Sequence, residues 1–240
     1  MNIAIIFAGG TGKRMNIKDV PKQFLELHGK PILIYTLEKF DQCDMIDAII
    51  LVCIKTWITY CEKLIEKHGI KKVKAIVPGG ETGMLSRYNG IKKAAELYPM
   101  DSVCLLHDGV RPLISKEIIC KNIECVEQNG SSITVAPATE TVAIYSESSN
   151  MVGEIFDRSR CQLARAPQCF RLNELLRIHE EAISKGIYDC IDTAFLMQKN
   201  GYSLYTVQGP VENIKITTPM DFYFFKAVVE MRENHQILGV

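Results

Sequence analysis

Glycines and cations near the N-terminus have the composition of a phosphate-binding loop. The segment AGGTGKRM at 8–15 holds glycines at 9, 10 and 12, followed directly by Lys13 and Arg14. Glycines allow backbone N–H groups to converge on phosphate oxygens, and the cations neutralise charge that the amides cannot. A tight turn with solvated cations fits the glycine cluster alone equally well. Pro21 and Lys22 add a third cation in a rigid segment, and together these features favour phosphate binding.

Two familiar kinds of glycine loop do not fit this segment. A Walker A loop requires GxxxxGK followed by Ser or Thr, whereas Arg14 follows Lys13 and Phe7 stands at the first glycine position. The dinucleotide motif GxGxxG also fails, because Gly12 is followed by KRM. Two adjacent cations indicate a ligand with more negative charge than a dinucleotide, such as a triphosphate.

The elements that must position this loop alternate between short apolar runs and longer stretches of helical period, the pattern of a parallel sheet with crossover helices. Strands are predicted at 3–7, 48–53, 73–77, 102–106 and 132–135. Helices are predicted at 31–40, with Pro31 in the first turn, and at 57–68, 84–97, 116–129, 172–185, 191–199 and 219–232. The glycine loop follows the first strand and therefore lies at the carboxyl edge of the sheet, where open α/β folds bind ligands.

The alternating pattern stops between about 140 and 168, where two extended segments flank a polar turn at 146–150. A long excursion without helical period in a compact domain is usually a functional arm or an interaction element. No boundary or internal repeat divides the chain. We therefore predict a single domain over 1–240 with a projecting arm at about 140–168.

Composition excludes several classes of function. Lys plus Arg and Asp plus Glu both number 28, so no net field attracts nucleic acid or an anionic membrane. The nine cysteines lie mostly in apolar runs without a CxxC pair, which favours buried free thiols over disulfides. Neither a signal peptide nor an apolar run of about 18 residues is present. We expect a cytoplasmic protein.

Seven separated motifs resemble those of the polyol-phosphate cytidylyltransferases, which comprise the 2-C-methyl-D-erythritol 4-phosphate and the ribitol-5-phosphate cytidylyltransferases. The motifs, which extend over essentially the whole chain, are AGGTGKRM at 8–15, PKQF at 21–24, GGETGMLSRYNG at 79–90, HDGVRP at 107–112, DR…APQ at 157–168, DTA at 192–194 and ENIKITTP at 212–219. Any one of these motifs alone would be weak evidence for the resemblance, whereas all seven in order make it strong.

The resemblance implies a Rossmann-like nucleotidyltransferase fold of the GT-A type, with a mostly parallel twisted sheet flanked by helices and a projecting β-arm. It implies CTP as a substrate and Mg²⁺ or another divalent cation. It also implies a homodimer in which the arm of each subunit reaches into the site of its neighbour. The reaction would be attack of a phosphate monoester on the α-phosphorus of CTP, with release of pyrophosphate.

The resemblance also assigns roles around the triphosphate. Arg14 and Lys22 would hold the triphosphate and the departing pyrophosphate, and Lys215 would touch the α-phosphate. The loop residues Ala8, Gly9, Gly10, Thr11, Gly12 and Lys13 would line the nucleotide. Asp108 follows a predicted strand and would be a metal ligand at the sheet edge; the alternative is a turn aspartate before Gly109, which is also expected at the nucleotide. His107 is expected to be structural.

The cytosine ring would be read by Gly80, Glu81 and Ser86. The family commonly carries an arginine at the position of Gly83, whereas this chain has its arginine at Arg87. Either Arg87 compensates, or the loop wraps the nucleotide differently.

The second substrate would meet Thr141 and Arg158 on the arm of the partner subunit, and Asp192. Arginine suits a phosphate because it is bidentate and permanently charged. For Asp192, a helix-capping role is an alternative to contact with a polyol hydroxyl.

Sequence details favour D-ribitol 5-phosphate as the second substrate. The Ala-Gly-Gly at 8–10 and the Val-Arg-Pro at 110–112 favour the ribitol branch, whereas Pro137 favours 2-C-methyl-D-erythritol 4-phosphate and Glu140 fits neither branch. The methylerythritol enzyme therefore stays as an alternative. A sugar-1-phosphate nucleotidyltransferase and a non-catalytic nucleotide-binding protein of the same fold are alternatives from other classes.

Overall fold

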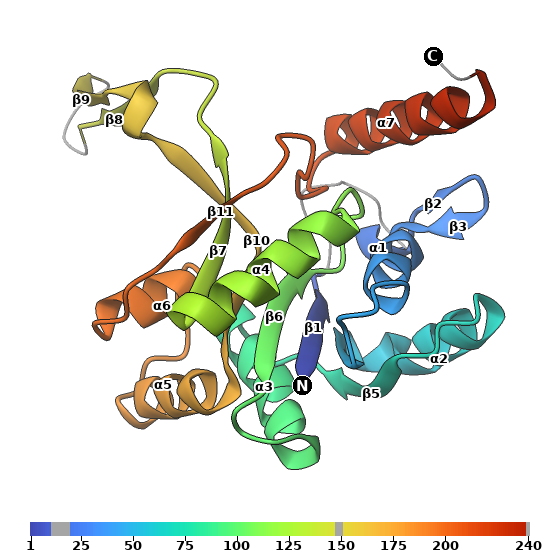
Figure 1. Ribbon diagram of the computed structural model, residues 1–240, viewed down its shortest axis with the longest axis horizontal. Coiled ribbons are helices and arrows are strands. Elements are labelled where there is room, and N and C mark those ends of the chain that lie inside the picture. The colour runs from blue at the N-terminus through green and yellow to red at the C-terminus, as the bar shows by residue number, and fades with distance from the viewer. Residues whose placement is uncertain (11–19, 147–150, 239–240) are drawn as a thin grey trace.

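Seven strands form the central sheet of the computed structural model, which describes residues 1–10, 20–146 and 151–238 (Figure 1). The strand order is β11-β7-β10-β6-β1-β4-β5, and all neighbours are parallel except β10, which is antiparallel to both β6 and β7. The strands of this sheet are β1 (Asn2–Ala8), β4 (Ala48–Cys53), β5 (Val73–Pro78), β6 (Val103–Asp108), β7 (Ser131–Pro137), β10 (Gln162–Arg171) and β11 (Thr206–Gln208).

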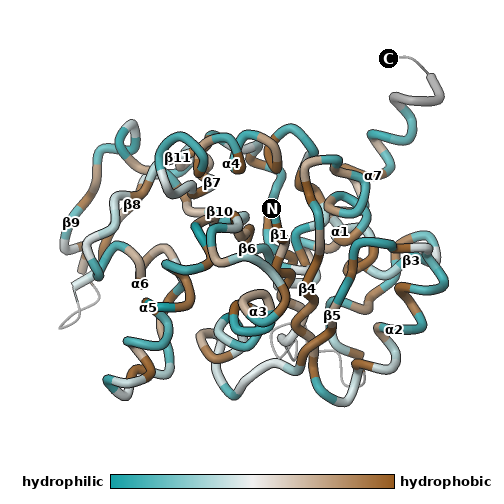
Figure 2. The backbone as a smooth tube through the Cα atoms, turned by 60° about the horizontal axis from the view of Figure 1, so that its bottom comes forward, coloured by the Kyte–Doolittle hydropathy of each residue, from teal (hydrophilic) through white to brown (hydrophobic). Residues whose placement is uncertain are grey.

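Helices cover both faces of the sheet. They are α1 (Ile32–Asp41), α2 (Ile58–Lys67), α3 (Gly83–Leu97), α4 (Lys116–Asn129), α5 (Leu172–Ser184), α6 (Thr193–Lys199) and α7 (Pro219–Leu238), with short 3-10 helices η2 (Lys22–Phe24), η3 (Lys55–Trp57) and η4 (Arg158–Arg160). Residues of β1 divide between two cores: Ala4 and Ile6 pack with α1, α2 and α4, and Ile3 and Ile5 pack with α3, α5 and α6. The central strands β1 and β4 are accordingly apolar along most of their length (Figure 2).

The predicted strands and helices are all present, with small differences at their ends. Pro31 was expected in the first turn of a helix, but its ψ of 145° is extended and it precedes α1 instead. The helix predicted from 191 begins at Thr193, because Asp192 caps it by accepting a hydrogen bond from the amide of Phe195 at 2.8 Å. Gly130 ends α4 in the left-handed region at φ 83°.

Two strands of the sheet were not predicted, β10 and β11. The residues up to 168 were assigned to the arm, whereas β10 begins in that segment and continues into the sheet beside β6. Pro167 lies inside β10, and a proline within an apolar run argues against a strand on sequence grounds. Strand β11 has only three residues and leaves little pattern to detect.

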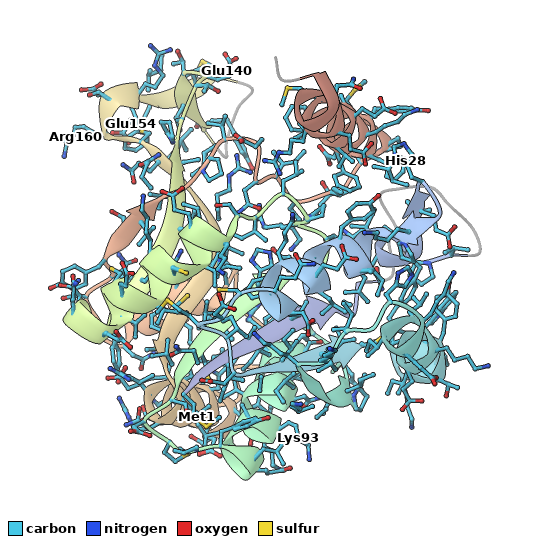
Figure 3. All side chains as sticks on the ribbon, turned by 45° about the vertical axis from the view of Figure 1, so that its right-hand side comes forward. Met1, His28, Lys93, Glu140, Glu154 and Arg160 are labelled. Atoms are coloured by element: carbon cyan, nitrogen blue, oxygen red, sulfur yellow. The ribbon has the colours of Figure 1, made fainter. Side chains whose placement is uncertain are left out.

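The segment predicted as two extended stretches forms the antiparallel pair β8 (Val142–Tyr145) and β9 (Val152–Phe156). This pair and α7 rise on either side of the end of the sheet opposite the N-terminus (Figure 1). Glu154 and Arg160 extend from the arm, well separated in the view from His28, which lies on the turn between β2 (Glu26–Leu27) and β3 (Lys30–Pro31) (Figure 3). In the described chain, no helix is long and apolar enough to cross a membrane.

Candidate active site

A pocket of about 640 Å³ lies at the carboxyl edge of the parallel strands, where the glycine loop was predicted to bind its ligand. Its wall comes from the residues that follow β1, β5 and β6, together with η2, α3, the middle of β10 and the start of α6. Ten residues with a predicted role line it: Ala8, Gly9, Gly10, Lys22, Gly80, Glu81, Ser86, Asp108, Asp192 and Lys215. The edge location follows from the parallel register of β4, β1 and β6, which ends these strands side by side.

Thr11, Gly12, Lys13 and Arg14 lie outside the residues that the structure describes, so their roles stay predictions. Gly109 does not line the pocket: its amide donates to the carbonyl of Phe7 at 2.8 Å, and its carbonyl accepts from Thr36 Oγ1 at 3.0 Å. A Cβ at this position would lie 2.9 Å from Leu33 Cδ1, so close packing accounts for the glycine.

Ser86 organises the loop that was predicted to read the cytosine ring. Its Oγ accepts from the amide of Gly80 at 3.0 Å and donates to the carbonyl of Thr82 at 2.9 Å. Thr82 in turn caps α3 by accepting from the amide of Leu85 at 3.1 Å. A Cβ at Gly80 would lie 2.5 Å from Leu85 Cβ, so only glycine fits this turn.

Asp108 lies at the end of β6 between two cations. Lys215 Nζ is 2.6 Å from its Oδ1, and Arg111 Nε is 2.8 Å from its Oδ2. Burial alone would raise the pKa of Asp108, but Lys215 and Arg111 hold it well below its usual range. The carboxylate therefore stays ionised at neutral pH and orients both cations in the pocket.

Two further contacts fix Lys215 beside Asp108, although the residues are far apart in sequence. Arg111 Nη1 donates to the carbonyl of Asn213 at 3.0 Å, and the amide of Ile216 donates to the carbonyl of Val110 at 3.0 Å. The ENIKITTP segment is thus attached to the HDGVRP segment on both sides of Lys215.

His107, the neighbour of Asp108, has the structural environment that was expected. It is buried and packs against Phe40 with ring centroids 5.0 Å apart and the ring planes tilted by 55°, and its Nε2 lies 3.2 Å from the carbonyl of Arg111. Burial lowers the pKa of His107 to about 4, so the ring is neutral at pH 7. A neutral ring facing a backbone carbonyl holds the Asp108 loop in place.

Asp108 is the one predicted metal ligand in the pocket. The described residues contain no group of three or more His, Cys, Asp or Glu side chains that could hold a metal ion. Magnesium, however, is typically bound by one or two carboxylates and substrate phosphates, with water completing the shell. Asp108 is anionic, and each of its oxygens has one cation partner and a second lone pair to offer. The site therefore fits a magnesium ion bound through Asp108 and the phosphates of a substrate.

Gly83 begins α3 beside the side chain of Arg87. Arg87 lines the same pocket one turn further along α3, and its Nη1 lies 3.5 Å from the position that a Cβ at Gly83 would take. Its Nη2 donates to the carbonyl of Cys190 at 3.2 Å. A guanidinium therefore stands beside Gly83 in the pocket, which favours compensation by Arg87.

Asp192 both caps α6 and faces the pocket. Its Oδ2 accepts from Gln168 Nε2 at 2.8 Å, and Gln168 Oε1 accepts from the amide of Ala194 at 2.9 Å. Gln168 thus joins β10 to the first turn of α6. The capping role of Asp192 is observed, and contact with a polyol hydroxyl stays a prediction.

The two arm residues lie apart from this pocket. Thr141 is exposed, and Arg158 donates from Nη1 to the carbonyl of Thr139 at 3.1 Å. Neither lines the pocket that holds Asp108 and Lys215. Their predicted contact with the second substrate would therefore have to be made in another copy of the chain.

Six polar residues of the pocket wall have no role predicted from the sequence: Gln23, Thr82, Arg111, Arg165, Gln168 and Thr193. All of them except Arg165 lie within the sequence motifs PKQF, GGETGMLSRYNG, HDGVRP, APQ and DTA, which indicated these segments but not the roles of these residues. Arg165 lies in the unspecified middle of the DR…APQ motif, on a strand that was not predicted, so the sequence did not single it out.

A family model described as "IspD: 2-C-methyl-D-erythritol 4-phosphate cytidylyltransferase" matches residues 2–231. The chain belongs to this family. The expected family and fold class are therefore confirmed, and this cytidylyltransferase chain is an enzyme.

Individual relatives include both branches of the family. A protein of Streptococcus agalactiae serotype Ia named ribitol-5-phosphate cytidylyltransferase is 50% identical over 240 residues, which is 100% of each chain. A 2-C-methyl-D-erythritol 4-phosphate cytidylyltransferase of Clostridium botulinum is 37% identical, over 95% of this chain and 97% of its own. The crystal structure of 4-diphosphocytidyl-2C-methyl-D-erythritol synthase from Anaerococcus prevotii superposes with a TM-score of 0.81 at 29% identity, covering 95% of this chain and 96% of the other.

Proposed function

We propose that this cytidylyltransferase transfers CMP from CTP to D-ribitol 5-phosphate, giving CDP-ribitol and pyrophosphate. The observation that carries the proposal is the 50% identity over the full length to a ribitol-5-phosphate cytidylyltransferase, against 37% for a methylerythritol-phosphate relative. The pocket supports it, because its charged groups suit two phosphate-bearing substrates.

The chemistry needs charge and alignment more than proton transfer. A phosphate monoester has a second pKa near 6 and is mostly a dianion at pH 7, so it can attack without a general base. One of its oxygens forms a bond to the α-phosphorus of CTP, while the bond from that phosphorus to the bridging oxygen of pyrophosphate breaks. Lys215 would stabilise the charge on the α-phosphate, and Lys22 and Arg14 the departing pyrophosphate.

The nucleotide would lie along the glycine loop and the loop before α3. Backbone amides of Gly9 and Gly10 would contact phosphate oxygens, and Gly80, Glu81 and Ser86 would surround the base. Asp108 would hold a magnesium ion together with the substrate phosphates. The ion would supply additional stabilisation of negative charge on the transferred phosphoryl group.

We propose that the enzyme is a homodimer completed by the arm. The β8–β9 pair exposes apolar side chains that a water-facing hairpin would not normally carry, with exposures of 52% for Ile144, 73% for Tyr145 and 64% for Ile155. Arg158 lies on the same arm and away from the pocket of its own chain. Insertion of the arm at a second copy would cover the apolar residues and bring Arg158 to the partner's acceptor site.

A second candidate substrate is 2-C-methyl-D-erythritol 4-phosphate, because the matching family model and the superposed structure carry its name. Both candidates are linear polyol phosphates, so a few hydroxyl contacts separate them. Both candidate reactions use CTP. We propose that the reaction takes place in the cytoplasm.

Pyrophosphate release tests this proposal. The purified protein is assayed with CTP, Mg²⁺ and each of three acceptors: ribitol 5-phosphate, 2-C-methyl-D-erythritol 4-phosphate and a sugar 1-phosphate. The expected result is the highest kcat/KM with ribitol 5-phosphate. A higher kcat/KM with 2-C-methyl-D-erythritol 4-phosphate would assign the chain to the other branch of the family. No turnover with any of the three acceptors would contradict the proposed reaction and support a non-catalytic nucleotide-binding protein.

A further inference from the structure

Arg165 lies where an irregularity in β10 brings it to the pocket wall. In the pairing with β7, Ala164 stands opposite Val135 and Gln168 stands opposite Ile133. Three residues of β10, from 165 to 167, therefore face a single residue of β7, Thr134. Bulges of this kind re-aim side chains beside functional sites. Arg165 lines the same pocket as Asp108 and Lys215.

The guanidinium of Arg165 has no acidic partner among the described residues. Asp108, which lines the same pocket, already pairs with both Lys215 and Arg111. The buried Nε of Arg165 makes no hydrogen bond to any described group. Burial and the nearby charge of Arg111 lower the pKa of Arg165 below its ordinary value, so the protein surroundings disfavour the charged form. An anionic ligand would relieve this cost.

The strand order indicates which anionic ligand would face Arg165. Along the carboxyl edge, β10 is separated from β1 by β6, and the loop of Gly80 follows β5 at the far edge. Arg165 therefore lies across Asp108 from both parts of the predicted nucleotide site. In phosphoryl transfer the attacking and leaving oxygens are roughly in line on opposite sides of phosphorus. A triphosphate held on the β1 side leaves the β10 side for the attacking phosphate.

We propose that Arg165 binds the phosphate of the acceptor, within the same subunit that holds Asp108 and Lys215. This inference rests on the proposed transfer to a polyol phosphate and adds a specific ligand for the attacking dianion. An arginine at this place can hold two phosphate oxygens at once and so fix the direction of attack.

The test compares Arg165→Gln with Arg171→Gln. Arg171 lies at the other end of β10, where its Nη1 donates to the carbonyl of Asp101 outside the pocket. For Arg165→Gln we expect the KM for ribitol 5-phosphate to rise about 10- to 100-fold, the loss of a hydrogen-bonded charge. The KM for CTP should stay within about twofold, Arg165→Lys should recover part of the loss, and Arg171→Gln should match the unaltered enzyme.

Calorimetric titration of ribitol 5-phosphate into each protein separates this inference from the proposed function. Weaker binding by Arg165→Gln, with an unchanged melting temperature, supports the role of Arg165 even if the unaltered enzyme gave no turnover and the proposed function failed. Equal binding of ribitol 5-phosphate by Arg165→Gln and the unaltered protein would overturn the inference. A rise confined to the KM for CTP would also overturn it, because Arg165 would then serve the nucleotide.

Discussion

Lys215 Nζ lies 2.6 Å from Oδ1 of Asp108, so the cation proposed to stabilise the α-phosphate is already held by an anion in the pocket. Arg111 occupies the other oxygen of Asp108 at 2.8 Å. The three groups together carry one net positive charge. The fixed position of Lys215 lowers the reorganisation needed when negative charge develops on a bound phosphate.

Replacement of Lys215 by alanine should lower kcat far more than it weakens CTP binding. A lost charge-stabilising group typically costs about 10²- to 10³-fold in kcat. The expected change in the Kd for CTP is much smaller, because the other phosphate contacts are retained. Steady-state pyrophosphate release and calorimetric titration of CTP measure the two quantities. Lys116→Ala is the matched control, since Lys116 also pairs with an aspartate, Asp44, but at the exposed surface. Turnover near that of the control would remove Lys215 from the site.

A methyl group at Gly80 should damage the base-reading loop, whereas one at Gly83 should not. The added Cβ at Gly80 would lie 2.5 Å from Leu85 Cβ and 2.9 Å from its backbone carbon, so the backbone must shift. At Gly83 the nearest atom would be Arg87 Nη1, at 3.5 Å. We expect Gly80→Ala to lose about 1–3 kcal/mol of stability and to bind CTP more weakly. Urea denaturation and CTP titration of both variants test this, and equal behaviour would contradict the packing argument.

The fold, and the site residues that directly follow strands, were predictable because the sequence patterns that indicate them are local. Gly9 and Gly10 directly follow β1, and the loop at Gly80 directly follows β5, so the ends of these strands fix both at the sheet edge. The pairing of Lys215 with Asp108 could not be predicted, because the two residues are far apart in sequence. It depends on the contacts made by the backbone carbonyls of Val110 and Asn213. Arg165 could not be predicted because it lies on an irregular strand with an internal proline.

Two buried histidines should make the protein less stable as the pH falls from 6.5 towards 5. Burial lowers the pKa of both His107 and His179 to about 4, from the usual 6.5. In this window the unfolded chain takes up protons that the folded chain does not, so the free energy of unfolding falls with pH. At pH 5 the loss is about 2 kcal/mol for each histidine.

Urea denaturation at pH 7 and pH 5 measures this loss, and the variant His179→Met supplies the control. His179 is fully buried, and its Nδ1 donates to the carbonyl of Leu175 at 2.8 Å, so the variant removes one titrating group from the interior. The pH-dependent loss should then fall by about half. An unchanged pH dependence in the variant would mean that His179 does not titrate as its burial requires.

Mixing two inactive variants should restore activity if each site uses the arm of the other subunit. Arg158→Ala damages the arm and Lys215→Ala damages the pocket, so a mixed dimer has one site with both defects and one with neither. With random pairing, half of the dimers are mixed and about a quarter of all sites are intact, so about a quarter of the normal activity should return. Co-expression with two affinity tags isolates the mixed dimer, whose activity should then approach half of normal. Recovery fails if Arg158 serves the pocket of its own chain, because every site in the mixture would carry one defect.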